Sequence, residues 1–297
     1  ITGTSYLCFR LQIHVILAAQ STTTQEAYLK LATYEHNGQT CVGAVTDGGL
    51  VDLTNEVESV KALLEGGDAA LAKATAAVEA ATSKVSESDV RLLAPVQNPN
   101  KLLCLAGNYS AHIAEGGGEF HGKEKSTPRV FMKPPTTTII GPGDAIELPR
   151  NAQKIDWECE LAVVIGKRAR FVDAADGLDY VAGYTVIIDV SERSLEVPDA
   201  REPRDGDKWF DWLNGKWFDT FAPMGPYLVM KDEIPDPQVM PIKLRVNGET
   251  KQDGNTGQMI FNVAEVVAWA STLVTLEPGD IIATGTLSGV GAATGDF

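Results

Sequence analysis

The chain of 297 residues carries 25 Lys and Arg against 40 Asp and Glu, and its formal net charge of −15 disfavours nucleic acids and anionic membrane surfaces as partners. Hydrophobic residues make up 44% of the chain, enough to close a large core, which excludes a disordered or fibrous protein. No apolar run approaches the roughly 20 residues that a membrane-spanning helix needs, so we expect no membrane partner.

Residues 1–27 are interpreted as a leader or poorly ordered segment. Their apolar stretch is interrupted by Arg10, Gln12 and His14, and a degraded export signal is the alternative interpretation. We expect a cytoplasmic protein.

The four cysteines, which lie far apart and match no zinc-site spacing, are expected to be reduced thiols. They are Cys8, Cys41, Cys104 and Cys159.

Residues 28–95 are predicted to form a small α+β domain. Two strand-like runs flank the dipeptide Asn37-Gly38, which is typical of a hairpin turn, and a short third run follows. Residues 56–86 then change to a helical, alanine-rich composition. Since Pro95 and its neighbours interrupt this pattern, we place the domain boundary near residue 95.

Residues 96–297 are predicted to form a second, predominantly β domain. Short apolar runs separated by Gly and Pro predict many strands, and one clear helix is expected over Asn262–Thr272. Many short strands with few helices favour a closed or rolled β-architecture within the α+β class. The expected strands are Leu102–Leu105, Val130–Lys133, Ala145–Leu148, Glu158–Ile165, Val181–Ile188, Leu228–Met230, Ile242–Val246 and Ile281–Thr284.

The first candidate for chemistry is a histidine followed by an acid and three glycines. His112 and Glu115 stand at i and i+3, so on a short helix the carboxylate can hydrogen-bond the imidazole and form an acid/base pair. Gly116–Gly118 would let this segment open and close as a lid. A surface histidine in a glycine-rich loop is the alternative.

The second candidate is a trio of carboxylates. On a strand, the period of two places Glu158 and Glu160 on one face, where they repel each other unless a cation lies between them. Asp189 ends another apolar strand. Three carboxylates at strand ends suit Mg²⁺ or Mn²⁺, and the lack of a neighbouring His or Cys disfavours zinc. A solvated strand end is the alternative for the glutamate pair.

Two later segments contribute further polar groups. Lys216 lies among aromatic residues, either with its amine in solvent or as a buried cation awaiting an anion. The Gly/Thr-rich segment Thr284–Gly291 can offer N–H and hydroxyl donors to a carboxylate. It matches no P-loop, and no GxGxxG motif opens a βαβ unit, so nucleotide binding has no support.

Taken in order, these segments resemble the fumarylacetoacetate hydrolase family. The resemblance spans about residues 100–297, and residues 30–95 look like the small domain that many bacterial members carry. The matching segments are Gly107–His112, Pro128–Pro134, Gly141–Asp144, Asp156–Glu160, Gly183–Ser191, Gly215–Asp219, Met259–Phe261 and Gly279–Thr286.

This resemblance implies the family's mixed β-roll, a homodimer, and a divalent-metal-dependent hydrolase. The reaction implied is cleavage of a C–C bond in an acylpyruvate-like or fumarylacetoacetate-like diketo acid, through an enolate that the metal stabilises. The implied roles are Mg²⁺ or Mn²⁺ binding by Glu158, Glu160 and Asp189, water activation by His112 oriented by Glu115, oxyanion or carboxylate binding by Lys216, and substrate contacts by Lys133 and Thr286.

Alternatives and departures from the family pattern stay open. Decarboxylation, isomerisation or dehydration of a 2-oxo or sugar acid would use the same residues. A catalytically dead interaction module is disfavoured because no carboxylate is lost and His112 is present, and a structural cation site is disfavoured because His112, Lys216 and the glycine lid would then have no purpose. Family members usually continue for some tens of residues past the loop near Phe297, so we expect a truncated C-terminus. The acidic insert Leu195–Trp212 is expected to reshape the substrate end, and Leu287 and Ser288 replace the family's usual Pro and small residues.

Overall fold

The computed structural model describes residues 11–12, 29–150, 152–195, 197 and 200–297. The predictions for residues 1–27 and for Cys8 therefore lie outside the described residues, apart from strand β1 (Leu11–Gln12). The other three cysteines are buried and free. Among the described residues, no helix combines the length and the apolar character needed to cross a membrane.

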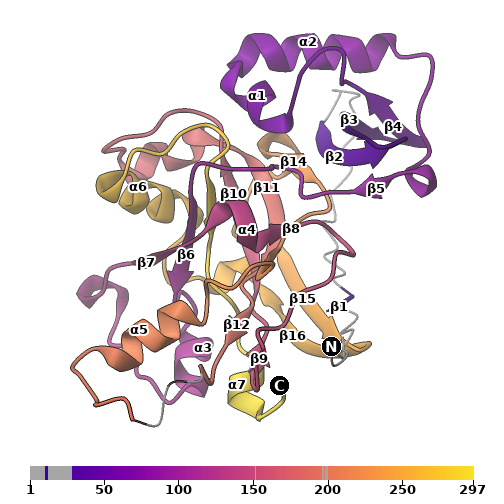
Figure 1. The fold of residues 1–297 in the computed structure, drawn as a ribbon. Helices are drawn as coiled ribbons and strands as arrows, with labels where there is room; N and C mark the ends of the chain where they lie inside the picture. Colours follow the sequence, from indigo (N-terminus) through magenta and orange to yellow (C-terminus); the bar gives the residue numbers. More distant parts are fainter. Residues whose placement is uncertain (1–10, 13–28, 151, 196, 198–199) are drawn as a thin grey trace, which may run out of the picture.

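A ten-stranded sheet forms the body of the molecule (Figure 1). Its neighbours pair antiparallel except for β17 and β6, which run parallel. In spatial order the strands are β4 (Gly49–Asp52), β3 (Gln39–Thr46), β2 (Lys30–His36), β14 (Leu228–Met230), β11 (Val181–Ile188), β10 (Cys159–Ile165), β17 (Ile281–Ala283), β6 (Leu102–Ala106) and β7 (Arg129–Lys133), with β5 (Arg91–Leu92) also pairing with β2. The predicted α+β class with a predominance of strands is confirmed.

The remaining elements are short and surround this sheet. Strand pairs outside it are β15 (Pro241–Val246) with β16 (Glu249–Asn255), β9 (Ile155–Asp156) with β12 (Ser191–Glu192), and β8 (Ile139–Ile140) with β13 (Ala222–Pro223). The α-helices are α1 (Val60–Glu65), α2 (Gly67–Ala80), α3 (Ser110–Glu115), α4 (Pro135–Thr138), α5 (Asp207–Asn214), α6 (Val263–Leu273) and α7 (Gly291–Thr294). The 3₁₀ helices are η1 (Glu87–Asp89), η2 (Lys123–Lys125), η3 (Ala174–Tyr180), η4 (Lys231–Glu233) and η5 (Thr256–Gln258).

The N-terminal hairpin continues the large sheet. Leu31 of β2 pairs with Leu228 of β14, so the N-terminal strands extend the sheet from the edge formed by β14. Helices α1 and α2 lie beyond these strands at one end of the molecule (Figure 1). Val60 and Leu63 of α1 share one hydrophobic cluster with Leu228. The backbone ladder and the core therefore both cross the boundary placed near residue 95, and the division into two domains stays a prediction.

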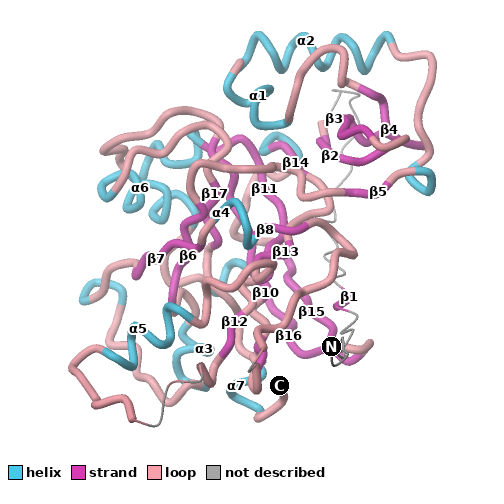
Figure 2. Tube along the Cα trace, viewed as in Figure 1, coloured by secondary structure: helices cyan, strands magenta, loops and turns pink. Residues whose placement is uncertain are grey.

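Strands β10 and β11 are the centre of the fold (Figure 2). Every residue of both strands is buried, because hydrophobic clusters cover both faces of the sheet at this point. Such strands need a nearly continuous apolar sequence, as these two have. Polar side chains are therefore confined mainly to the strand ends, and that is where the candidate site lies.

The helix predicted from the spacing of its apolar residues over Asn262–Thr272 is present as Val263–Leu273, whereas one strand prediction is wrong. The Asn262 side chain accepts a hydrogen bond from the Glu265 N–H at 2.9 Å, and the Glu265 carboxylate accepts one from the Asn262 N–H at 2.9 Å, which fixes the start of α6. Residues Ala145–Leu148, predicted as a strand, are irregular. Their apolar alternation lets Ile146 pack on the core, but the Glu147 N–H bonds a threonine side chain instead of a neighbouring strand. Alternation predicts burial; it does not supply a ladder partner.

The close contact between β11 and β14 leads to a stability prediction. A Cβ atom added at Gly183 would lie 2.2 Å from the carbonyl oxygen of Val229. We expect Gly183→Ala to lower the free energy of unfolding by about 1–3 kcal/mol, measured by urea denaturation, because two paired strands must separate to accept the methyl group. Gly116→Ala is the control, since its Cβ would meet nothing nearer than 3.6 Å. Equal stability of both variants would contradict the close packing.

Candidate active site

Antiparallel pairing of β10 with β11 brings the three predicted carboxylates together. Cys159 pairs with Ile188, so Glu158, just before β10, lies beside Asp189, just after β11. The Asp189 N–H donates to the Glu158 carbonyl at 2.8 Å and ties the two strand ends. Glu160 follows two positions along β10, on the same side as Glu158. One ligand atom of each carboxylate lies within 4.8 Å of the others, and all three residues are buried.

Buried cations neutralise two of these carboxylates. The Lys216 ammonium donates to Glu158 at 2.8 Å and to Asp189 at 2.7 Å, and Lys133 donates to the other Asp189 oxygen at 2.5 Å. Arg193 forms an ion pair with Glu158 from the remaining side. Burial alone would raise the pKa of Glu158, but the charges of Lys216 and Arg193 outweigh burial and lower that pKa to about 2. Glu158 is therefore ionised.

Glu160 lacks such compensation. One of its oxygens accepts the Gly285 N–H at 2.6 Å, and the other has no hydrogen-bond partner among the described residues although it is fully buried. Burial, together with the neighbouring charges of Asp189 and Glu158, raises the pKa of Glu160 well above its usual range. An orphaned carboxylate oxygen beside two other carboxylates is stabilised by a divalent cation. The all-oxygen donor set fits Mg²⁺ or Mn²⁺.

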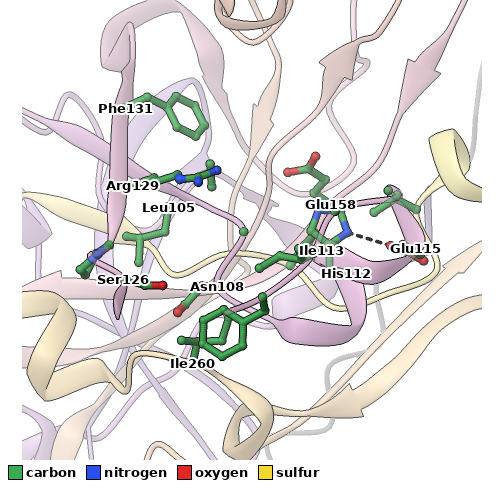
Figure 3. A pocket seen from close by; sticks show the side chains of 18 of the residues that line it. Leu105, Asn108, His112, Ile113, Glu115, Ser126, Arg129, Phe131, Glu158 and Ile260 are labelled. Carbon is green, nitrogen blue, oxygen red and sulfur yellow. Dashed lines mark hydrogen bonds and ion pairs between the residues drawn. The ribbon is translucent and has the colours of Figure 1, made fainter. Parts of the chain in front are cut away.

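The predicted acid/base pair is formed on helix α3. The His112 Nδ1 lies 2.7 Å from the Glu115 Oε1 (Figure 3), and the Gly289 N–H donates to the other Glu115 oxygen at 2.8 Å. A carboxylate accepts only from a protonated ring nitrogen, so Nδ1 carries the hydrogen and the Nε2 lone pair is left free for chemistry. The lid motion assigned to Gly116–Gly118 stays a prediction.

The pair and one member of the carboxylate trio, Glu158, line the same cavity of about 980 Å³. His112, Glu115, Glu158 and Lys216 all line it, and Figure 3 shows the first three near one another on one side. Lys216 is 1% exposed, and its ammonium lies 5.4 Å from the Trp212 ring centroid. The interpretation of Lys216 as a buried cation among aromatic rings is therefore confirmed, and its anions come from the protein.

The two predicted substrate contacts are placed differently from each other. Thr286 lines the cavity, but its hydroxyl donates to the Cys159 carbonyl at 3.0 Å and accepts from Gln252 at 2.8 Å. Lys133 is buried behind Asp189 and does not line the cavity. The contacts observed for Lys133 hold Asp189 in place. Substrate contact by either residue stays a prediction.

Sequence reasoning missed several residues of the site. Arg193 bridges Glu158 and Asp156, and the Asn108 side chain ties the start of the α3 segment to Thr284 by a bond of 2.8 Å to its carbonyl. Trp209 and Trp212 line the cavity from α5. This helix overlaps the end of the insert Leu195–Trp212, which is predicted to reshape the substrate end. The only sequence signal for Arg193 was a cation four positions after Asp189, which is weak.

Comparison with known proteins places these features in context. The family model "Fumarylacetoacetate (FAA) hydrolase C-terminal" matches residues 101–297. A mitochondrial oxaloacetate tautomerase of Rattus norvegicus is 42% identical over 248 residues, covering 82% of this chain and 75% of the relative.

Two solved structures are similar over most of the chain. Maleylpyruvate hydrolase from Sphingobium sp. SYK-6, in complex with manganese(II) ion and pyruvate, has a TM-score of 0.71 and 28% identity, covering 89% of this chain and 90% of that one. The 2-hydroxyhepta-2,4-diene-1,7-dioate isomerase from Mycobacterium marinum has a TM-score of 0.65 and 30% identity, covering 89% of both chains. The relatives thus include a tautomerase, a hydrolase and an isomerase.

The uncompensated carboxylate leads to a metal-binding prediction. We expect Glu160→Gln, which keeps the side-chain shape, to weaken Mn²⁺ binding by at least about tenfold, because one anionic ligand of three is lost. Titration calorimetry measures the affinity, and Glu277→Gln, outside the trio and 44% exposed at its side chain, is the control. Unchanged affinity in Glu160→Gln would remove the trio as the metal site.

Proposed function

Because this chain belongs to the fumarylacetoacetate hydrolase family, we propose that it is a divalent-metal-dependent enzyme acting on small 2-oxo acids, and that its main reaction is keto–enol tautomerisation. The observation that carries the proposal is one cavity lined by the His112–Glu115 pair and by Glu158, which belongs to the buried carboxylate trio. Proton transfer beside a ketone needs a base and stabilisation of the developing oxyanion, and this site offers both. The 42% identity to an oxaloacetate tautomerase supports the choice of reaction.

The metal is assigned to Glu158, Glu160 and Asp189. When bound there, Mg²⁺ or Mn²⁺ would supply Lewis-acid stabilisation for negative charge on the ketone oxygen. Lys216 contributes a fixed positive charge at the same wall of the cavity, because its ammonium is held between Glu158 and Asp189. A preoriented cation of this kind favours the enolate over the ketone without further rearrangement.

His112 is the residue assigned to proton transfer. Its Nε2 takes a proton from the carbon next to the ketone, the C–H electron pair forms the C=C bond while the C=O π pair moves onto the oxygen, and the imidazolium then returns the proton to that oxygen to give the enol. Glu115 accepts the Nδ1 hydrogen throughout and stabilises the imidazolium form. The anchoring of Glu115 by the Gly289 N–H fixes the orientation of the ring. No water is consumed, and the reverse reaction uses the same groups.

Hydrolysis of a C–C bond in an acylpyruvate-like or fumarylacetoacetate-like diketo acid is the second candidate. The same imidazole would activate a water molecule, and a cavity of about 980 Å³ has room for both water and a longer substrate. The similarity to a maleylpyruvate hydrolase solved with manganese and pyruvate supports this alternative. Decarboxylation and dehydration share the enolate.

The homodimer and the cytoplasmic location stay predictions, and the rat relative is mitochondrial by name.

The role of His112 is tested by its removal. We expect His112→Ala to lower kcat for oxaloacetate tautomerisation by about 10²–10⁴-fold, the range typical of a general acid–base residue. Mn²⁺ affinity should stay within about twofold of the original because His112 is not one of the three carboxylate ligands. Tautomerisation is followed by the loss of enol absorbance. Full activity in the variant would reject the assignment.

A substrate panel separates the two candidate reactions. We expect Mg²⁺-dependent tautomerisation of oxaloacetate that stops when EDTA is added, because the enolate loses its stabilising charge. Pyruvate release from acetylpyruvate, measured in parallel, reports C–C hydrolysis. Faster pyruvate release than tautomerisation would make hydrolysis the main reaction, and activity of either kind that survives EDTA would contradict the metal-dependent mechanism.

A further inference from the structure

One face of strand β7 carries three side chains toward the site. Side chains alternate along a strand, so Arg129, Phe131 and Lys133 share a face. Lys133 reaches Asp189, and Phe131 packs edge-on against Trp212 with ring centroids 5.0 Å apart. Burial decreases along this row, since Lys133 and Phe131 are buried and Arg129 is exposed. Arg129 therefore continues the row of site residues toward the mouth of the cavity.

Arg129 lines the cavity without an acidic partner. Figure 3 shows its guanidinium pointing from β7 into the space on whose other side Glu158 and His112 lie. Among the described residues no carboxylate lies within 4.0 Å of this guanidinium, whereas Arg193, the other arginine in the cavity wall, pairs with Glu158. Lys125 of η2 also lines the cavity and also has no ion pair within the described part of the chain.

The acids of the cavity wall do not offset these two cations. Glu158 is paired with Lys216 and Arg193, and Glu115 with His112. Glu119 also lines the cavity, but it is 83% exposed at its side chain and lies 3.8 Å from His121. The end of the cavity formed by Arg129 is thus positively charged, and a guanidinium binds carboxylates through two parallel hydrogen bonds.

We propose that Arg129 is a specificity-determining residue that binds a second carboxylate of the substrate, at the end remote from the reacting 2-oxo group. The assignment rests on the proposed function for the placement of the 2-oxo end at the carboxylate trio. It names the substrate class as 2-oxo dicarboxylic acids and disfavours 2-oxo monocarboxylic acids. Arg129 and Glu158 line the same cavity, and its volume of about 980 Å³ leaves room for a short carbon chain between the two ends.

The test compares Arg129→Met with the original protein in the presence of Mg²⁺. Binding of oxaloacetate, 2-oxoglutarate and pyruvate is measured by quenching of tryptophan fluorescence, since Trp209 and Trp212 line the cavity. We expect the Kd of a dicarboxylate to rise by about tenfold, the effect of losing a charge-assisted hydrogen bond, and the Kd of pyruvate to change by less than about twofold. Arg129→Lys should recover part of the dicarboxylate affinity because it keeps the charge.

The control is Arg168→Met, which removes an arginine that is 68% exposed at its side chain and does not line the cavity. An equal loss of affinity for pyruvate and for the dicarboxylates in Arg129→Met, or no loss for either, would overturn the inference. Binding and turnover are read separately. A protein that binds dicarboxylates through Arg129 but turns none of them over would retain this inference and count against the proposed function.

Discussion

The structure depends on how two fully buried antiparallel strands end beside each other. The pairing of β10 with β11 forces Glu158 and Asp189 into contact, and the strand period adds Glu160. Three carboxylates removed from water are unstable together unless cations accompany them. Lys216, Lys133 and Arg193 supply that compensation and come from three different parts of the chain. The charges therefore specify how β7 and the segments after β11 dock onto the central strands.

The cations do not compensate the charge of all three carboxylates, and Glu160 is the carboxylate left without one. Lys216 and Lys133 approach Asp189 from two sides, yet neither bonds Glu160, whose second oxygen remains unpartnered within the described chain. A folded protein tolerates such an oxygen at a cost in stability, which is common at functional sites. The same feature favours a divalent cation, since one ligand atom of each carboxylate lies within 4.8 Å of the others.

Much of this arrangement follows from local sequence periodicity. The i, i+2 spacing of Glu158 and Glu160 and the i, i+3 spacing of His112 and Glu115 set which side chains share a face, and both pairs lie as expected. The sequence did not show that Lys133 bonds Asp189, since that contact depends on β7 reaching the site through β6 and β17. Periodicity also failed at residues 145–148, where burial alternates but no strand is adjacent. Local sequence patterns determine which side chains share a face of a helix or strand, whereas the order of strands in the sheet determines which residues they contact.

The loop after β17 acts through its main chain on both halves of the site. The Gly285 N–H bonds Glu160, and the Gly289 N–H bonds Glu115. The number of residues between the two glycines therefore helps to set the distance between Glu160 and Glu115. Both contacts are made by main-chain N–H groups, so neither depends directly on the side chains of Leu287 and Ser288, which lie between them. The length of the loop matters more, so inserting or deleting one residue between the two glycines would shift Glu160 and the His112–Glu115 pair relative to each other.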